Sequence, residues 1–215
     1  MIPTTSVLSF RILGVPVEIG MTALMLVAFL ALSAGRSGAE GLVAGAAYAV
    51  VLLVSILVHE LGHAVVGTRL GLRPQRIVLH GFGGFCEYGR RPRPAEGVIS
   101  SLAGPGAGLL LGGALIVARV VLGGALPGHV LSLLETGIFI NVFWSLFNLL
   151  PMYPLDGGQV LWHGLRLRLD PAKADKITRA VSIPVAILAG IGGYMMGFMF
   201  IPLISFFAIM QALRI

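Results

Sequence analysis

The sequence predicts an all-α polytopic membrane protein with about six transmembrane helices and one small β-hairpin. Of its 215 residues, 57% are hydrophobic and 11% are charged. A soluble globular domain carries roughly 25% charged residues, because polar groups must cover its large surface. The apolar residues also gather in runs near the roughly 20 residues that a helix needs to cross a bilayer. These observations exclude a water-soluble monomer and a disordered chain, and the single cysteine excludes a disulfide scaffold.

Five apolar runs define the predicted helices. They occupy residues 19–34, 42–66, 98–122, 130–150 and 180–213. The last run is too long for one span, and four glycines between positions 190 and 197 divide it into two short helices. We therefore expect six spans in a single membrane-embedded domain, residues 1–215, with a core of about residues 42–159.

The connection between the second and third predicted helices has a different pattern. Residues 75–80 are rich in β-branched side chains, and Gly-Phe-Gly-Gly at 81–84 is typical of a turn. Residues 85–88 form the expected returning strand. We predict a small hairpin here, followed by an irregular arm rich in arginine and proline.

The basic residues predict the orientation of the chain. With six alternating spans, thirteen of the fifteen lysines and arginines fall on the side of the N-terminus, and only Arg36 and Arg119 fall on the other. Basic residues near span ends favour the cytoplasmic face. Both termini and the hairpin should therefore be cytoplasmic in an integral membrane protein. The net charge of +6 reflects this topology. Anionic lipid headgroups are the expected neighbours of the basic residues, and nucleic acid is not an expected partner.

The second predicted helix contains the pattern His59-Glu60-Leu61-Gly62-His63. A chain of this composition contains H-E-x-x-H by chance on the order of 0.003 times. On a helix, residues four apart lie on one face, so the two imidazoles can bind one zinc ion while the glutamate acts on bound water. The alternative is a buried polar patch held by hydrogen bonds. It is disfavoured because a charged carboxylate at membrane depth costs a few kcal/mol and needs a partner.

Two histidines leave a tetrahedral zinc site short of one protein ligand. Asp156 is the favoured candidate, because it lies at the cytoplasmic end of the fourth predicted helix, at a depth similar to His59 and His63. Most other acids lie among basic residues in polar connections or at the opposite ends of spans. Two prolines before Asp156 interrupt helical hydrogen bonding, and two glycines after it allow either close approach or a sharp turn.

Three motifs together resemble the site-2 proteases, the intramembrane zinc metalloproteases, and among them the minimal prokaryotic members. The motifs are His59-Glu60-x-x-His63, Ser101-Leu102-Ala103-Gly104-Pro105 and Asn148-x-x-Pro151-x-x-Pro154-Leu155-Asp156-Gly157-Gly158. The resemblance covers about residues 42–159, and the first and last predicted helices match only as apolar segments. One departure is Gly108, where many members have asparagine. Glycine has no polar side chain, so this departure weakens the case for a polar contact at that position.

The resemblance implies hydrolysis of peptide bonds within or near the transmembrane segment of a single-span membrane protein, in the bilayer of a prokaryotic cell. It implies one zinc ion per chain. The residues that it assigns to zinc are His59, His63 and Asp156. It also implies Glu60 as the general base, and Asn148 with neighbouring Pro154 as substrate-binding residues.

Several alternatives stay open at the level of sequence. A metal-dependent transporter also places ionisable residues and broken helices inside the membrane, although no inverted repeat is visible. A protease-like binding protein without catalysis is the second rival, although all four site residues are present. The hairpin could accept an extended substrate along its edge or simply plug the cytoplasmic entrance.

Asn141 is expected to bond between helices, and His80, His129 and His163 are expected to be ordinary polar residues. Substrate identity and oligomeric state are not predicted.

Overall fold

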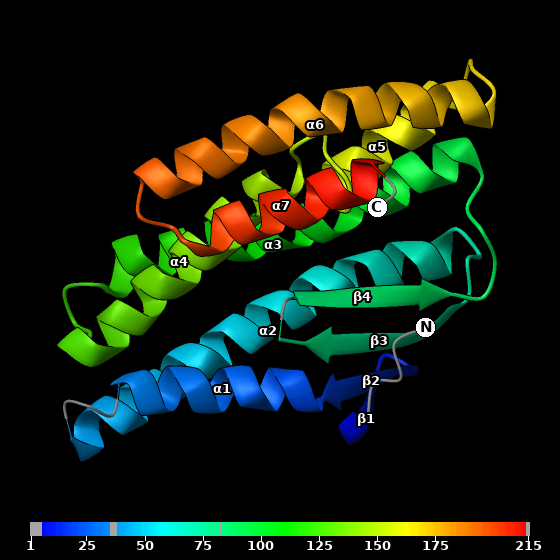
Figure 1. Ribbon diagram of the computed structural model, residues 1–215. Helices are drawn as coiled ribbons and strands as arrows, with labels where there is room; N and C mark the ends of the chain where they lie inside the picture. The colour runs from blue at the N-terminus through cyan, green and yellow to red at the C-terminus, as the bar shows by residue number, and fades with distance from the viewer. Residues whose placement is uncertain (1–5, 35–37, 82, 214–215) are drawn as a thin grey trace. The chain divides into compact units, whose positions relative to one another are not determined.

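A computed structural model describes residues 6–34, 38–81 and 83–213, which form four strands and seven helices (Figure 1). The elements, in chain order, are β1 (Ser6–Ile12), β2 (Val15–Gly20), α1 (Met21–Ala34), α2 (Ala39–Arg69), β3 (Pro74–His80), β4 (Gly83–Tyr88), α3 (Pro94–Leu122), α4 (Gly128–Asn148), α5 (Asp156–Leu165), α6 (Pro171–Met195) and α7 (Phe200–Leu213). The chain is therefore mostly helical, with a small sheet built from its first half.

Contacts within the chain divide it into two compact units. The first unit comprises the described residues up to Arg91 together with Gly106–Ser145. The second comprises Pro92–Pro105 and the described residues from Leu146 onward. Helices α3 and α4 each contribute to both units.

The sheet has the strand order β1-β2-β3-β4. Strands β1 and β2 are antiparallel around Leu13 and Gly14, whose φ angles of 50° and 81° are the left-handed values that a two-residue hairpin turn requires. Strand β2 then pairs in parallel with β3, and α1 and α2 supply the crossover that a parallel pair needs. Strand β4 pairs antiparallel with β3 and is the last strand in the order.

The two N-terminal strands correct the all-α prediction. The sequence was expected to begin with a helix at residues 19–34, whereas β1 and β2 precede α1, which begins at Met21. The signal was an alternation at the start of β2, where Val15 and Val17 are buried and Pro16 and Glu18 are half-buried. A six-residue strand is stable only when paired. The partner of β2 is β3, some 60 residues later, so local pattern alone did not reveal it.

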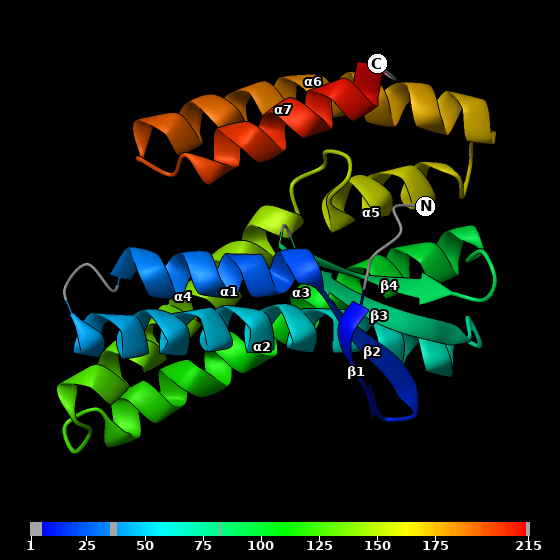
Figure 2. The same cartoon turned by 60° about the horizontal axis from the view of Figure 1, so that its bottom comes forward.

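The core of the first unit lies between the sheet and α2. Strands β3 and β4 both contact α2, and α1 lies beside α2 in both views (Figures 1 and 2). Val17, Ile77 and Leu79 of the sheet pack with Ile56 and Ala64 of α2. These apolar contacts fix the sheet against the helix that carries the H-E-x-x-H pattern.

Among the described residues, four helices are long and apolar enough to cross a membrane, namely α2, α3, α4 and α6. Two shorter apolar helices, Met21–Ser33 and Phe200–Leu213, lie where the first and last spans were expected. The chain is an integral membrane protein by this count, and six spans remain a prediction.

In the second unit, α6 and α7 lie side by side (Figures 1 and 2). Glycines of α6 allow this approach, since a Cβ on Gly193 would lie 2.5 Å from Ile201 Cβ. Arg179 of α6 donates to the carbonyls of Gln211 and Ala212, at 2.9 and 2.8 Å. It thereby satisfies carbonyl groups at the end of α7 that lack helical partners.

Candidate metal centre

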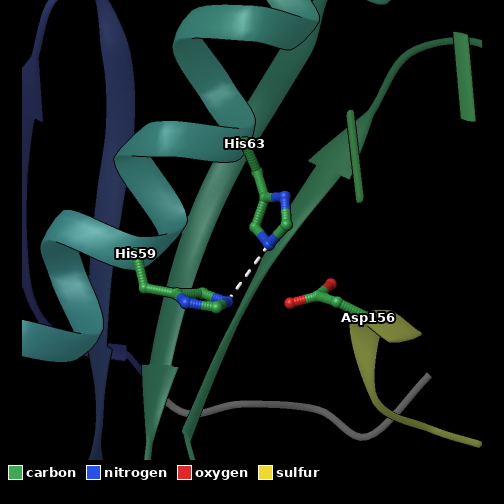
Figure 3. Close-up of side chains that lie close together, drawn as sticks. All are labelled: His59, His63 and Asp156. Atoms are coloured by element: carbon green, nitrogen blue, oxygen red, sulfur yellow. Dashed lines mark hydrogen bonds between the residues drawn. The ribbon is translucent and has the colours of Figure 1, made fainter. Parts of the chain in front are cut away.

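The two histidines of α2 meet at their Nε2 atoms. His59 and His63 are one helical turn apart, and their Nε2 atoms are separated by 3.2 Å (Figure 3). Two nitrogen ligands of a tetrahedral zinc ion, each about 2.0–2.1 Å from the metal, lie about 3.3 Å apart. The separation in the structure therefore fits two imidazoles that share one metal ion.

Asp156 is the first residue of α5. Its carboxylate and the ring nitrogens of His59 and His63 supply ligand atoms that all lie within 4.8 Å of one another (Figure 3). Two imidazoles and one carboxylate form a donor set known from catalytic zinc sites, in which the fourth position stays open. The three residues that the sequence analysis assigned to zinc therefore fit the ion chemically.

Two glycines explain how α5 begins at Asp156. A Cβ on Gly157 would collide with the carbonyl oxygens of Leu149 and Leu150, and a Cβ on Gly158 would lie 2.6 Å from the carbonyl carbon of Met152. Neither glycine has a positive φ. Of the two alternatives left open by the sequence, close approach of the backbone is the one found.

Glu60 is 5% exposed and follows His59 on α2. A Cβ on Gly84 of β4 would lie 2.7 Å from Glu60 Cγ and 3.0 Å from its Oε1. The backbone of β4 therefore runs directly against this side chain.

Burial, and then the charge of Glu60, raise the pKa of the Cys86 thiol to about 12. Cys86 is therefore neutral at physiological pH.

Tyr88 fastens β4 to the same stretch of α2. Its hydroxyl donates to the backbone carbonyl of His63 at 3.0 Å. Its ring covers Gly67, where a Cβ would lie 2.5 Å from Tyr88 Cε1. The roles of Gly84 and Tyr88 were not predicted from the sequence. The available signal was Gly67, one turn after His63, where a small residue leaves room for a ring.

A polar contact joins α2 and α4 one turn before His59. Asn141 Nδ2 donates to Ser55 Oγ at 2.9 Å, and the Ser55 hydroxyl donates to the carbonyl of Val51 at 2.8 Å. Asn141 is 3% exposed, so this bond is shielded from solvent. It is the interhelical bond expected for Asn141.

Gly108 lies where α3 packs closely on α4. A Cβ at this position would collide with the hydroxyl of Ser145. The asparagine that the resemblance implies at this position would require the Ser145 side chain to move.

The remaining candidates lie elsewhere in the fold. Asn148 ends α4 and is half-buried, and Pro154 is exposed in the 149–155 loop. Their contact with substrate remains a prediction. His163 is buried on α5 with its ring against Gly97, and burial together with Arg166 lowers its pKa to about 4. It is therefore a neutral side chain at physiological pH.

Comparisons with known proteins relate this chain to zinc metalloproteases. The family model of peptidase family M50 matches residues 47–127 and 123–191. A zinc metalloprotease of Methanocaldococcus jannaschii is 28% identical over 202 residues, which cover 94% of this chain and 58% of the relative. Rip3 of Mycobacterium tuberculosis is 34% identical over 173 residues, which cover 76% of this chain and 44% of Rip3. The chain thus spans about half the length of these relatives.

A solved structure establishes the fold. The site-2 protease from Methanocaldococcus jannaschii superimposes with a TM-score of 0.66 at 24% sequence identity, over 96% of this chain and 94% of that one. The helical chain, its small sheet and its apolar helices therefore adopt the site-2 protease fold. Because the family model matches residues 47–191, the chain belongs to peptidase family M50.

Proposed function

We propose that this chain is an intramembrane zinc metalloprotease that hydrolyses peptide bonds within or near the transmembrane segment of a membrane protein. One observation carries the proposal: ligand atoms of His59, His63 and Asp156 lie within 4.8 Å of one another, and Glu60 directly follows the first histidine. Membership of family M50 and the four long apolar helices support it.

One zinc ion per chain would be held by His59, His63 and Asp156. When bound, zinc supplies a Lewis acid for the scissile carbonyl and lowers the pKa of bound water to about 7. Three protein ligands leave one position for water or substrate. This is the arrangement expected of a catalytic zinc site rather than a structural one.

Glu60 is the proposed general base. Its carboxylate would take a proton from the attacking water and return it to the nitrogen of the leaving amine. Such proton transfer typically contributes 10²- to 10⁴-fold to a rate. Glu60 suits the role because β4 packs against it at Gly84, which restricts where the carboxylate can go.

A transmembrane helix hides its carbonyls in i to i+4 hydrogen bonds, so a substrate must unwind before cleavage. Strand β4 is the last strand of the described sheet and passes Glu60 at Gly84. An extended segment paired with the open edge of β4 would lie beside the general base. This contact favours strand addition over a plug as the role of the hairpin. Asn148 and Pro154 are proposed as substrate-binding residues.

The proposal extends to the setting of the enzyme. Its substrate would be a single-span protein in a prokaryotic cell membrane, with the termini of the protease and its zinc site facing the cytoplasm. The distribution of basic residues supports this orientation. All described residues would act as one membrane-embedded protease domain.

The test uses the purified chain in detergent and a fluorescent protein fused to a single synthetic transmembrane segment. We expect about one zinc ion per chain, cleavage that stops when a chelator removes zinc, and recovery when zinc is restored. Asp156→Ala should lose zinc. Asp170→Ala is the matched control, since Asp170 is an exposed carboxylate that caps α6. It should keep its zinc.

The rival functions give different results in the same experiment. A transporter would bind metal and leave the fusion intact under every condition. A binding protein without catalysis would retain the fusion on the protease without cutting it. Either result would contradict the proposed function.

A further inference from the structure

The loop of residues 149–155 carries the chain from α4 to Asp156, and the whole of it lies in the second unit. Within the loop, the Met152 amide donates to the Leu150 carbonyl at 2.7 Å and the Leu155 amide donates to the Met152 carbonyl at 3.0 Å. Leu155, the N-cap of α5, provides no side-chain hydrogen bond to the helix. The first turn of α5 therefore lacks the side-chain cap that commonly fixes a helix start.

Helix α6 holds this loop through a serine. The amide of Tyr153 donates to Ser182 Oγ at 3.1 Å, and the same hydroxyl donates to the carbonyl of Thr178 at 2.7 Å. Ser182 and Thr178 are both 0% exposed, and Tyr153 is 8% exposed. The Ser182 hydroxyl thus acts as donor and acceptor at once, in a place where no solvent can replace it.

The Met152–Tyr153 peptide, whose amide donates to Ser182, also contacts the first turn of α5. A Cβ on Gly158 would lie 2.6 Å from the carbonyl carbon of Met152 and 2.8 Å from the amide nitrogen of Tyr153. The first turn of α5 therefore packs directly on the Met152–Tyr153 peptide. Gly158 is only two residues after Asp156, so the serine, the peptide and the carboxylate are linked by consecutive contacts.

We propose that Ser182 is a positioning residue for Asp156, and that it acts by fixing the Met152–Tyr153 peptide against the start of α5. A serine inside a helix commonly bonds back to the carbonyl four residues earlier and needs no other partner. Here the hydroxyl also receives the loop amide. Without it, Tyr153 would keep a buried donor with no partner at this position, and the peptide would move to find one. This inference rests on the proposed zinc site.

A matched control lies on the neighbouring helix. Ser205 of α7 is 3% exposed, and its buried hydroxyl has no hydrogen-bond partner among the residues that the structure describes. It lies against Gly190 of α6, where a Cβ would be 3.1 Å from Ser205 Cβ. Ser182→Ala and Ser205→Ala each delete one buried hydroxyl in the same unit. Only the first deletion affects the loop before Asp156.

The test compares zinc affinity in the wild type, Ser182→Ala and Ser205→Ala, by competition with a chromogenic chelator. Loss of a group that orients a metal ligand typically lowers affinity 10- to 100-fold. We expect a zinc dissociation constant about 10-fold higher for Ser182→Ala, and no change for Ser205→Ala. Cobalt(II), whose visible absorption reports ligand geometry, should give an altered spectrum only in Ser182→Ala.

A purely structural role would lower the melting temperature of metal-free Ser182→Ala and leave zinc affinity and the cobalt spectrum unchanged, which would overturn the inference. If Ser182→Ala does not fold, Ser182→Cys keeps the side-chain volume with a weaker hydrogen bond and should show a smaller loss of zinc affinity. Wild-type zinc affinity in Ser182→Cys would then overturn it. A wild type that binds no zinc contradicts the proposed function itself, so the two failures can be distinguished.

Discussion

At the scale of single residues, Gly84 and Glu60 illustrate how a missing side chain can matter as much as a reactive one. Glu60 is nearly buried on α2, and the space for its carboxylate exists because β4 has no Cβ at position 84. Any larger residue would displace either the strand or the carboxylate. The glycine therefore belongs to the proposed catalytic arrangement although it carries no chemistry.

Gly84→Ala tests this contact. The new methyl group would overlap Glu60, so we expect kcat to fall at least 10-fold, a part of what a general base contributes. Zinc content should stay near one per chain, because neither histidine nor Asp156 is touched. Gly113→Ala is the control, since a Cβ there meets no other atom within 4 Å. Wild-type turnover by Gly84→Ala would show that the contact does not constrain Glu60.

The residues of the site differ in how far sequence could predict them. His59 and His63 lie together because residues four apart share a helix face, which is local geometry. Asp156 was chosen by elimination among the acids, and its carboxylate does lie near the histidines. Gly84, Tyr88 and Ser182 were not predicted. Their contacts join segments that are distant in sequence, and an ordinary glycine, tyrosine or serine carries no spacing that marks such a contact.

At the scale of elements, the attachment of β4 to α2 determines how the sheet meets the metal-binding helix. The attachment includes apolar packing between sheet and helix and a polar contact from Tyr88 to the carbonyl of His63. That carbonyl belongs to a proposed zinc ligand. Movement of β4 should therefore shift His63 and change the affinity for zinc.

Tyr88→Phe removes the polar contact and keeps the ring over Gly67. We expect a loss of about 1 kcal/mol in the free energy of unfolding, together with zinc affinity several-fold weaker. Tyr48→Phe also removes one hydroxyl bond from α2, to Ser132 at 2.8 Å, far along the helix from the histidines. It should cost similar stability without weakening zinc binding. Equal zinc affinities in the two variants would contradict the coupling.

How well each helix or strand could be predicted depends on the length of its sequence pattern. Runs of more than 20 apolar residues predicted α2, α3 and α4 well, because each such run has few alternatives to a helix. The glycines from 190 to 197 predicted a break that does occur near Gly197, which has a φ of 79°. Gly190 and Gly193 instead lie inside α6, where the absence of a side chain lets α7 pack closely. Strands β1 and β2 were missed because their stability depends on β3.

At the scale of the whole molecule, buried neutral histidine makes stability depend on pH. His163 has a pKa of about 4 in the folded chain, compared with 6.5 for an ordinary histidine, because burial and then Arg166 oppose its protonation. Between these values the unfolded chain binds more protons than the folded one. The folded state is therefore most favoured above pH 6.5 and loses stability as the pH falls toward 4.

Lowering the pH from 7 to 5 should cost about 2 kcal/mol through this histidine. His163→Leu should remove that share of the pH dependence, and melting temperatures in detergent at the two pH values would measure it. His129→Leu replaces an exposed histidine at the start of α4 and should keep the wild-type dependence. If His163→Leu loses as much stability as the wild type over this range, His163 is not the group responsible.

The central claim is that one glutamate beside a His-His-Asp zinc site makes this membrane chain a protease. The most direct measurement compares the purified wild type with Glu60→Gln, for zinc content and for cleavage of the same single-span fusion. We predict about one zinc ion in each protein and cleavage by the wild type alone, with the loss in Glu60→Gln at least 10²-fold. A wild type without zinc, or equal cleavage by the two proteins, would contradict the claim.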